Sequence, residues 1–313
     1  MTPTWAVAGL AIDAVLGEPP ARVHPVVWFG SVMRRLEQVS YRDHRSAGLG
    51  HLVAGVAIAA GAGTAVRRLV GPRPAAAVAV AVCAAGRMLD GEAKAVADLC
   101  RAGDLHAARL RVRSLVGRDT DLLDATDLSR AVIESVAENS VDAVVATLWW
   151  GTIAGAPGVL VHRAVNTLDA MVGHRNEHYG RFGWASARLD DVVNFVPARL
   201  AALGVALARP RRARAVQQTI RRDASAHPSP NGGVIEAAYA AALDVGLGGS
   251  NRYGDVVENR GRLGRGRPPS PDDVRAAIWL RQTSTAAVAG LLCVARLGFC
   301  LRNPRNRPSL WHD

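Results

Sequence analysis

Long apolar runs of Ala, Val, Leu and Gly recur along the sequence and define its pattern. They cover residues 4–16, 49–66, 75–85, 143–161, 192–208 and 284–301. In residues 49–66 only His51 and Thr64 interrupt the apolar pattern. At about 1.5 Å per residue, a helix of this length covers about 27 Å, close to the hydrocarbon thickness of a bilayer. The pattern therefore predicts a membrane-spanning helix over residues 49–66.

The other apolar runs carry residues that shorten or bend a helix. Residues 4–16 are short for a span and indicate a re-entrant or partly buried segment. Pro72 and Pro74 predict a turn, so that residues 49–66 and a second helix from Ala75 onward form a hairpin. Helix breakers in the later runs are Gly155, Pro157, Gly158 and Pro197. We predict an all-α, polytopic integral membrane protein with about four or five spans and cytoplasmic helical loops.

The remaining segments are polar, and none resembles a linker between domains. Residues 90–127 carry charges on one face and apolar side chains on the other, which predicts an amphipathic segment in water or at the membrane interface. Residues 209–284 are hydrophilic and too long for a simple connector, so we expect a functional cytoplasmic loop region there. We interpret residues 1–313 as one membrane domain with a polar core at residues 114–200.

The net charge of +11 comes almost entirely from arginine, because Lys94 is the only lysine. The arginines cluster just outside the apolar runs, as they do in loops that obey the positive-inside rule, so we expect these loops in the cytoplasm. No basic stripe is interleaved with aromatic residues, and we therefore exclude nucleic acid as a partner. The four cysteines show no CxxC pair and no Cys/His metal spacing, which indicates reduced, buried side chains. We expect no cleavable signal peptide, because Asp13 interrupts the first apolar run.

Carboxylates and carboxamides recur within or beside the apolar segments in the middle of the chain. An isolated charge in such surroundings loses its hydration and must be paired, coordinated or neutralised. Glu134, Glu138 and Asp142 are spaced four residues apart, so a helix places them on one face, with Asn139 beside them. Hard cations such as Mg²⁺ bind oxygen ligands of this kind. The alternative is a solvated acidic face with Arg130 as an ion-pair partner.

Further candidate residues lie on both sides of this helix. A second group of acids and amides consists of Asn166, Asp169, Asp190, Asp191 and Asn194, and N-caps use the same residue types. Arg118, next to Asp119, predicts either a buried ion pair or an anion clamp for phosphate. Three polar residues suited either to acid–base work or to an interfacial loop are His174, His178 and Tyr179.

A proline-rigidified loop near residue 230 contains His227, Ser229 and Asn231. It leads into a helix containing Glu236, and the N-terminal amides of that helix can hold an anion. The sequence has no GxxxxGK[ST], GxSxG, HExxH or dinucleotide-binding motif. Any use of ATP is therefore not of the Walker type.

Six stretches together carry a family resemblance. They are LGEPPARVHPV (16–26), SLVGRDT (114–120), RAVIESVAENSVDAVVA (130–146), AVNTLDAMVGHRNEHYGRFGWASARLDDVVNFVPARL (164–200), HPSPNGGVIEAAYAAAL (227–243) and LGGSNRYG (247–254). Through them the chain resembles the CobD/CbiB family of cobalamin biosynthesis, the adenosylcobinamide-phosphate synthases, over nearly its whole length. Departures from the family pattern occur at Ala143, Thr147, Ala170 and His174.

The resemblance implies that a propionate carboxyl of adenosylcobyric acid is joined to aminopropanol or its O-phosphate as an amide, giving adenosylcobinamide or its phosphate. Because amide formation from a carboxylate is uphill in water, the implied reaction uses ATP and Mg²⁺ and passes through an acyl phosphate. Implied metal or acid–base residues are Glu134, Glu138, Asp142, Asp169 and Asp190, with Glu138 and Asp142 as metal ligands. Implied substrate contacts are Arg118, Asn139, Asn166, Asn194, Arg199, His227, Ser229 and Asn231, with Arg118 and Arg199 on phosphate.

Two other functions remain open from the sequence. A membrane carrier would also bury acids in kinked helices, although repeated halves would then be expected. The other is a regulatory membrane protein without ligase activity. For the ligase, we expect a multi-pass protein of the cell membrane whose active site faces the cytoplasm, with the corrinoid, aminopropanol or its phosphate, and the lipid bilayer as partners. Homo-oligomerisation and association with other enzymes of the cobalamin pathway are left open.

Overall fold

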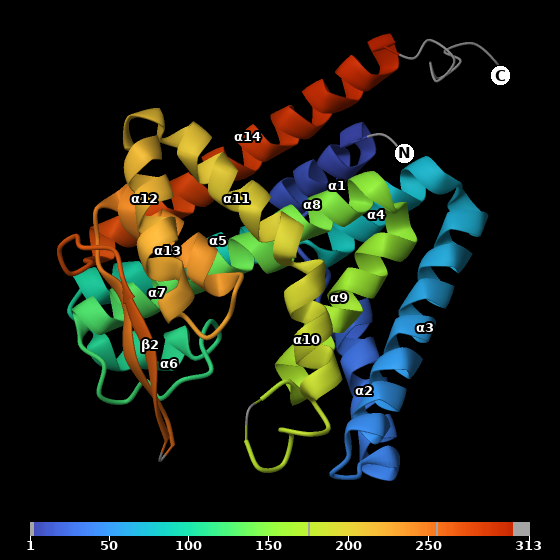
Figure 1. The fold of residues 1–313 in the computed structure, drawn as a ribbon, viewed down its shortest axis with the longest axis horizontal. Helices are drawn as coiled ribbons and strands as arrows, with labels where there is room; N and C mark the ends of the chain where they lie inside the picture. Colours follow the sequence, from blue (N-terminus) through green and yellow to red (C-terminus); the bar gives the residue numbers. More distant parts are fainter. Residues whose placement is uncertain (1–2, 175, 255, 303–313) are drawn as a thin grey trace.

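Helices dominate the computed structural model, which describes residues 3–174, 176–254 and 256–302 (Figure 1). The α-helices are α1 (Pro3–Leu16), α2 (Pro25–Ser40), α3 (Arg45–Val70), α4 (Pro72–Cys83), α5 (Gly86–Arg101), α6 (Leu105–Val112), α7 (Ala125–Asn139), α8 (Ala146–Ile153), α9 (Gly155–Val172), α10 (Trp184–Val193), α11 (Phe195–Ala208), α12 (Ala213–Asp223), α13 (Gly232–Leu243) and α14 (Pro271–Arg302). Short helical turns are η1 (Ala21–Val23), η3 (Pro210–Arg212), η4 (Ala224–Ala226) and the π-helix η2 (Ser140–Val145). The strands are β1 (Leu247–Tyr253) and β2 (Val256–Leu263). The predicted helical membrane fold is confirmed, and the hairpin of β1 and β2 is an addition to it.

Within the described residues, three helical stretches are long and apolar enough to cross a membrane: Arg45–Val70, Pro72–Arg101 and Pro271–Phe299. The bent pair α10 and α11, with 43° between the two helices, raises the number to four if the pair forms one span. A count of four agrees with the lower limit of the predicted four or five spans, whereas a count of three falls below it. The apolar run at residues 143–161 does not add a continuous span, because α8 ends at Ile153 and α9 starts at Gly155 with φ +63°.

Helix α3 packs along α9 through glycines (Figure 1). A Cβ atom on Gly63 would lie 2.5 Å from Cα of Pro157, and one on Gly55 would lie 2.8 Å from Cδ1 of Leu168. Small residues let membrane helices approach closely and gain van der Waals contact. Only 28% of the apolar window of α3 is buried, so most of this helix remains available to lipid.

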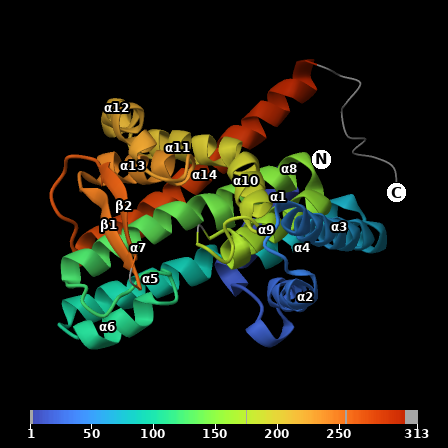
Figure 2. The same ribbon diagram turned by 60° about the horizontal axis from the view of Figure 1, so that its bottom comes forward.

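Helices α7 and α8 are joined by η2 into one helical run through the molecule. Helix α7 begins at the N-cap Asp124, whose side chain accepts a hydrogen bond of 2.8 Å from the Asp127 amide. Its apolar face is buried against α5, α6, α13 and α14, and Figure 2 shows it beside α5 and α6 and below the hairpin. The π-turn begins directly after Asn139, the last residue of α7, and it contains Asp142, so it changes the helical phase between Glu138 and Asp142. Such turns occur mostly at functional sites.

Most of the segment expected as a loop region, residues 209–284, is folded into helices and strands. Helix α12 carries exposed arginines such as Arg214 and Arg221, whereas the Ala-rich α13 behind it is buried over nearly its whole length. Residues 209–284 are hydrophilic on average, although they contain the buried apolar helix α13. Helix α14 also begins at Pro271, earlier than the predicted apolar run at residues 284–301.

The β1–β2 hairpin is antiparallel, and its register shifts between Gly248 and Ser250. Gly248 has φ +77°, and a Cβ atom there would lie 2.1 Å from the carbonyl oxygen of Gly261. Only glycine fits this close backbone approach. The hairpin contacts α7 and α13 and so covers the buried acids of α7.

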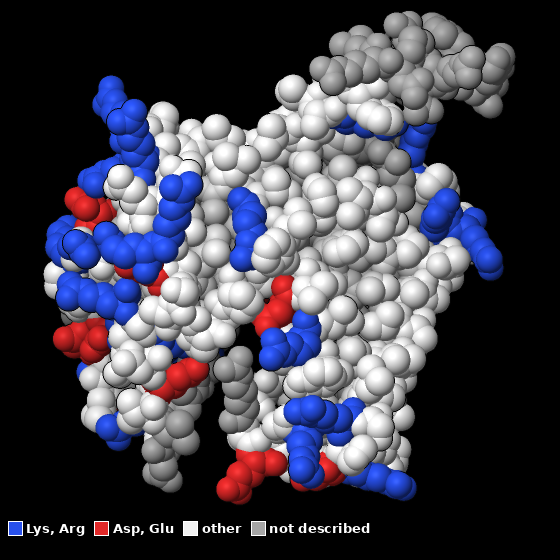
Figure 3. Space-filling view, in the orientation of Figure 1, with Lys and Arg blue, Asp and Glu red and all other residues white. Residues whose placement is uncertain are grey.

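Charged side chains are unevenly distributed over the surface. Figure 3 shows Lys and Arg over the α12 and hairpin end and near the lower ends of α2 and α3, with a smaller group at the upper end of α3. A broad uncharged surface lies between them, over the α4, α8 and α3 side of the view. This uncharged face is suited to contact with a bilayer.

Candidate active site

Polar side chains converge where α7, α13 and the hairpin meet the ends of α9, α10 and α11. They form three groups, which we name the Arg118 cluster (Arg118, Glu134 and Asn251), the His227 cluster (Glu138, His227 and Glu236) and the Asp142 cluster (Asp142, Asn166, Asp190 and Asn194). The groups interact electrostatically: Glu134 acts on Glu236, and Glu138 acts on Asp142. The clusters therefore form one continuous polar region.

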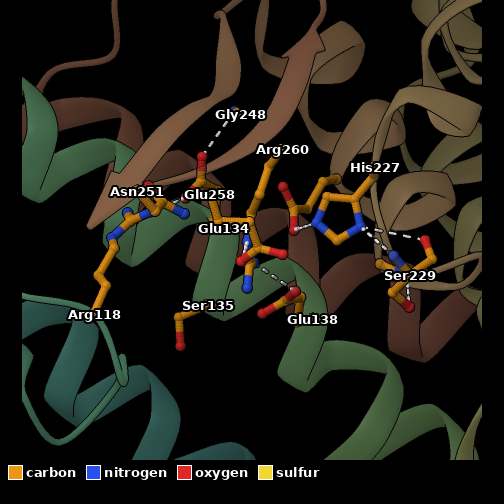
Figure 4. Close-up of polar contacts among 12 residues, drawn as sticks. Arg118, Glu134, Ser135, Glu138, His227, Ser229, Gly248, Asn251, Glu258 and Arg260 are labelled. Atoms are coloured by element: carbon orange, nitrogen blue, oxygen red, sulfur yellow. Dashed lines mark hydrogen bonds and ion pairs between the residues drawn. The ribbon is translucent and has the colours of Figure 1, made fainter. Parts of the chain in front are cut away.

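The Arg118 cluster contains a buried ion pair (Figure 4). Nη1 of Arg118 lies 2.8 Å from Oε2 of Glu134, and both side chains are 4% exposed. The other oxygen of Glu134 accepts a hydrogen bond of 2.8 Å from the Gly248 amide, which fixes the hairpin to α7. Nη1 of Arg118 also donates to Oδ1 of Asn251. Nε and Nη2 of Arg118 are buried without a hydrogen-bond partner in the described part of the chain, so the guanidinium keeps donors that a bound anion could accept.

In the His227 cluster an imidazole meets two carboxylates (Figure 4). Nε2 of His227 lies 3.3 Å from Oε1 of Glu236, which is completely buried. One oxygen of each glutamate and a ring nitrogen of His227 all lie within 4.8 Å of one another. The Glu138 side chain is 36% exposed and forms the open side of the group, with Nη1 of Arg260 3.4 Å from its Oε1. This donor set could hold a metal ion.

The loop before α13 fixes the imidazole in place. Nδ1 of His227 lies 3.1 Å from the Ser229 amide nitrogen and 3.2 Å from the Ser229 carbonyl oxygen. Oγ of Ser229 accepts hydrogen bonds from the amides of Asn231 and Gly232 at 3.3 and 3.1 Å. A Cβ atom on Gly232 would lie 2.8 Å from Cε1 of His227 and 3.3 Å from Oε1 of Glu138. The turn therefore has no room for a side chain beside the ring.

Burial governs protonation in the His227 cluster, which lies outside the candidate membrane spans. Burial, followed by the Glu134 carboxylate, raises the pKa of Glu236 to about 8. Burial, followed by the Glu236 carboxylate, raises the pKa of Glu138 to about 8. Glu236 is the more deeply enclosed of the two, since the Glu138 side chain remains partly exposed. Burial also lowers the pKa of His227, and both effects favour uncharged side chains when no cation is bound.

In the Asp142 cluster, Asn166 links two carboxylates from different helices. Its Nδ2 donates to Oδ2 of Asp142 at 3.2 Å and to Oδ1 of Asp190 at 3.5 Å. Nδ2 of Asn194 lies 3.1 Å from both oxygens of Asp190. Oδ1 of Asn194 in turn lies 2.8 Å from Nε2 of the buried His162. Amides from α9 and from the α10–α11 junction thus hold these carboxylates close together.

The Asp142 cluster concentrates negative charge. Burial, then Asp190, then Glu138 raise the pKa of Asp142 well above its usual value. Asp169 and Asp191 lie close enough to Asp190 to act on it electrostatically. Carboxylates in such a group ionise together only when a cation or an arginine compensates their repulsion.

Arg199 and Asn231 join the α10–α11 region to the loop that carries His227. Nη1 of Arg199 donates to Oδ1 of Asn231 at 2.6 Å, and Nη2 donates to the Pro230 carbonyl at 3.2 Å. Nδ2 of Asn231 donates to the Asp191 carbonyl at 2.8 Å. Both side chains therefore hold the loop in position between the His227 and Asp142 clusters.

Most of the residues predicted from the sequence lie in or beside these clusters, and their individual roles remain predictions. Asn139 lies at the end of α7, where its Nδ2 donates to the Ser135 carbonyl at 2.9 Å. His178 and Tyr179, which follow α9, contact other parts of the molecule. The Tyr179 hydroxyl lies 2.7 Å from Oε1 of Glu37, and the His178 ring stacks on Tyr41. These side chains bind α2 to the segment before α10 and do not enter the three clusters.

Three polar residues of this region are not among the candidate site residues predicted from the sequence: Asn251, Arg260 and His162. Asn251 lies in the LGGSNRYG stretch, whose paired glycines could have indicated a close backbone approach. Arg260 gave no comparable signal, because its surroundings resemble those of the many solvated arginines. His162 follows an apolar run, and its burial depends on the break between α8 and α9.

The CobD/Cbib protein family model matches residues 6–281. The chain belongs to the CobD/CbiB family. It is 45% identical to the Cobalamin biosynthesis protein CobD of Mycobacterium tuberculosis over 289 residues, which cover 90% of this chain and 92% of the relative. It is 42% identical to the protein of the same name from Rhodobacter capsulatus over 306 residues, which cover 92% and 96% of the two chains. No solved structure gives a significant match.

Membership of the CobD/CbiB family assigns the chain to cobalamin biosynthesis. Among the described residues, the group of three ligand atoms that lie within 4.8 Å of one another is formed by Glu138, His227 and Glu236. Glu138, Asp142 and Asp190 do not form such a group, but each offers a carboxylate oxygen, and Mg²⁺ is usually bound through one or two carboxylates together with water and substrate phosphates. Arg163, at 3.4 Å from Oδ1 of Asn166, approaches this region from α9.

Proposed function

We propose that this CobD/CbiB family member joins a propionate carboxyl of adenosylcobyric acid to aminopropanol or its O-phosphate, with ATP and Mg²⁺, as an adenosylcobinamide-phosphate synthase. The observation that supports this most directly is the meeting of the His227 and Asp142 clusters along α7 and η2. Carboxylates, an imidazole and amides from separate helices share one polar region there, beside apolar helices. Activation of a carboxylate requires this combination of cation ligands and a water-poor site.

The proposed chemistry has two steps. A carboxylate oxygen of the corrinoid attacks the γ-phosphorus of ATP, and ADP leaves with its bond electrons. The amine nitrogen then attacks the acyl carbon, so that a C–N bond forms and the C–O bond to phosphate breaks. Inorganic phosphate leaves, and the proton lost by the amine passes to a carboxylate of the protein. ATP thus supplies the free energy for an amide that would not form from the free acid in water.

Within this proposal each residue of the site has a separate role. Glu138 and Asp142 would hold Mg²⁺, which compensates phosphate charge when bound. Asp190, oriented by amide donors at 3.1 and 3.5 Å, accepts the proton from the amine, with Asp169 beside it. Arg118 offers its buried free donors to a phosphate, and Arg199 positions the loop that closes over the substrate.

An acyl phosphate must be protected from hydrolysis, and in this proposal the buried apolar side chains of η2 exclude water from it. Val141, Val144 and Val145 are at most 2% exposed and flank Asp142. Excluding water also strengthens the electrostatic interactions of the site. Because ATP and the corrinoid precursor are cytoplasmic, we propose that the polar region opens to the cytoplasm.

The proposal is tested with membranes that contain the full chain. They are incubated with adenosylcobyric acid, aminopropanol phosphate, ATP and Mg²⁺, and the corrinoids are analysed by mass spectrometry. We expect the amide product, and we expect none when ATP is omitted. Movement of the unchanged corrinoid across sealed vesicles, without amide formation, would replace the ligase by a membrane carrier.

Two variants test the site itself. Glu138→Gln and Asp142→Asn keep size and polarity but remove charge, so we expect product formation to be lost while membrane insertion persists. Asp121→Asn is the matched control, because Asp121 is exposed and pairs only at the surface with Arg113. Normal turnover in both site variants would contradict the proposed roles of these carboxylates.

A further inference from the structure

Glu236 lies in an unusual environment for a carboxylate. Its side chain is completely buried in α13, and neither oxygen makes a hydrogen bond to a described residue. The ionised form of a carboxylate is costly to bury unless it is paired or bound to a metal. Its close polar neighbour is Nε2 of His227, which is itself buried without a hydrogen-bond partner. A buried carboxylate and a buried ring nitrogen, neither with a hydrogen-bond partner among the described residues, therefore face each other at 3.3 Å.

We propose that the His227 cluster binds a borderline first-row divalent cation of the zinc type, held by Nε2 of His227 and by carboxylate oxygens of Glu138 and Glu236. This site is chemically distinct from the all-oxygen position of Mg²⁺ and stands independently of the amide-forming reaction. The three donor atoms lie within 4.8 Å of one another, which an ion at their centre requires. Glu138 lies between the two clusters, and its two oxygens allow it to serve both.

The combination of one imidazole and two carboxylates favours Zn²⁺ over Mg²⁺. Imidazole is a ligand for Zn²⁺ and related transition metals, whereas Mg²⁺ prefers oxygen ligands and gives up its water reluctantly. A cation beside the enclosed Glu236 must lose most of its water. Zinc sites with three protein ligands keep one coordination position open for water or substrate. In this site the open position would lie on the partly exposed side, next to Glu138.

The surroundings of His227 are compatible with metal binding through Nε2. The Ser229 backbone presents both its N–H and its C=O to Nδ1, at 3.1 and 3.2 Å. With a cation on Nε2, Nδ1–H donates to the Ser229 carbonyl, which is the orienting contact that metal-bound histidines usually have. Without a cation, Nδ1 accepts from the Ser229 amide and Nε2–H faces Glu236. The loop thus supports either tautomer without a change of backbone.

Charge balance also favours a cation. The ionised carboxylates of Glu138 and Glu236 carry two negative charges, and a divalent cation neutralises both beside an uncharged imidazole. Arg260, whose Nη1 lies 3.4 Å from Oε1 of Glu138, also acts electrostatically on Glu236, but its single positive charge compensates only one of the two carboxylates. Gly232 keeps this interior free, because a Cβ atom there would lie 3.3 Å from Oε1 of Glu138.

The test uses the full chain, purified in detergent without a polyhistidine tag and stripped with a chelator. After dialysis against Zn²⁺ with excess Mg²⁺, metal content is measured by mass spectrometry and ligand type by zinc-edge X-ray absorption. We expect one zinc per chain, with imidazole and oxygen scattering and no sulfur. Failure to retain zinc against Mg²⁺, or zinc bound without imidazole, would overturn the proposal, and neither result depends on amide formation.

Variants then locate the site. Glu236→Gln and His227→Gln should weaken zinc binding at least about tenfold, as the loss of groups that hold a metal does. Glu258→Gln is the matched control, because Glu258 lies 3.6 Å from Arg260 but outside the three donors. Folding is checked by gel filtration and circular dichroism, and the wild-type spectrum decides the question if a variant does not fold. Unchanged affinity in both folded variants would contradict the assignment.

Discussion

At the scale of single residues, Asn166 is the link that the Asp142 cluster depends on. Its Nδ2 is shared by carboxylates from η2 and α10. Hydrogen bonds to charged groups contribute about 1.5–3 kcal/mol each, so their loss releases both carboxylates from their positions. We expect Asn166→Leu to lower the rate of amide formation at least about a hundredfold, as misplacement of reacting groups does, and membrane assays with product detection measure this.

The neighbouring Thr167 provides the control for this prediction. Its hydroxyl donates to the Arg163 carbonyl within the same helix, at 2.7 Å. Thr167→Val preserves shape and leaves the acids untouched, so turnover should remain near wild type. Equal losses in both variants would mean that disturbance of α9, and not release of the carboxylates, explains the effect of Asn166→Leu.

The Arg118–Glu134 pair makes a prediction about stability. Glu134→Gln leaves a buried guanidinium without its counter-charge, and breaking a buried pair in this way costs about 3–5 kcal/mol. The exposed pair of Arg113 and Asp121 is the comparison, because surface pairs contribute about 0–1 kcal/mol. We therefore expect a large loss of unfolding free energy for Glu134→Gln and almost none for Asp121→Asn. Denaturant unfolding in detergent micelles measures both, and similar losses would show that Glu134 is not structural.

At the scale of elements, the contact between α3 and α9 depends on glycine. Gly63→Val adds atoms where even a Cβ lies 2.5 Å from Cα of Pro157, so the helices must separate. Overpacking costs about 1–3 kcal/mol. Gly61→Val on the same helix is the control, because no atom of the described residues lies within 4 Å of its Cβ position. We expect a clear fall in melting temperature for Gly63→Val alone; equal behaviour of the two variants would contradict the packing.

Regular patterns made some elements predictable from the sequence. Residues 49–66 lie inside α3, and the prolines at 72 and 74 start α4, because long apolar runs and proline act locally. The β1–β2 hairpin was missed because its strands are polar and short, and because a positive φ at Gly248 is not visible in composition. The helix that follows the His227 loop was predicted, but the burial of this helix, α13, was missed because averaging over residues 209–284 mixed it with exposed arginines.

The sequence predicted most of the residues of the candidate site, but it did not predict which of them contact one another. Periodicity placed Glu134 and Glu138 on one helix face, but it could not show that one pairs with Arg118 and the other with the imidazole group. Arg118 lies 16 residues from Glu134 across a loop, and His227 and Glu236 lie 89 and 98 residues from Glu138, in positions that tertiary packing sets. The π-turn that contains Asp142 likewise cannot be predicted from the helical spacing of the residues.

At the scale of the whole molecule, the distribution of charge is the main guide to orientation. The helices long and apolar enough to cross a membrane lie beside a broad uncharged surface, and the arginines gather over α12 and the hairpin (Figure 3). Positively charged segments tend to stay in the cytoplasm. The α12 and hairpin end, which also covers the His227 cluster, is therefore the end we expect on the cytoplasmic side.

Cysteine labelling tests this orientation. In a variant whose four native cysteines are replaced by alanine, Gln218→Cys places one thiol on the exposed side of α12. A membrane-impermeant maleimide should leave this thiol unlabelled in intact cells and label it after lysis, because the bilayer separates reagent and thiol only in the first case. A periplasmic cysteine-containing marker protein confirms that the reagent reaches the outer face. Labelling of Gln218→Cys in intact cells would place α12 outside, where cytoplasmic ATP cannot reach the polar region, and the proposed amide formation would then require another route for its phosphate donor.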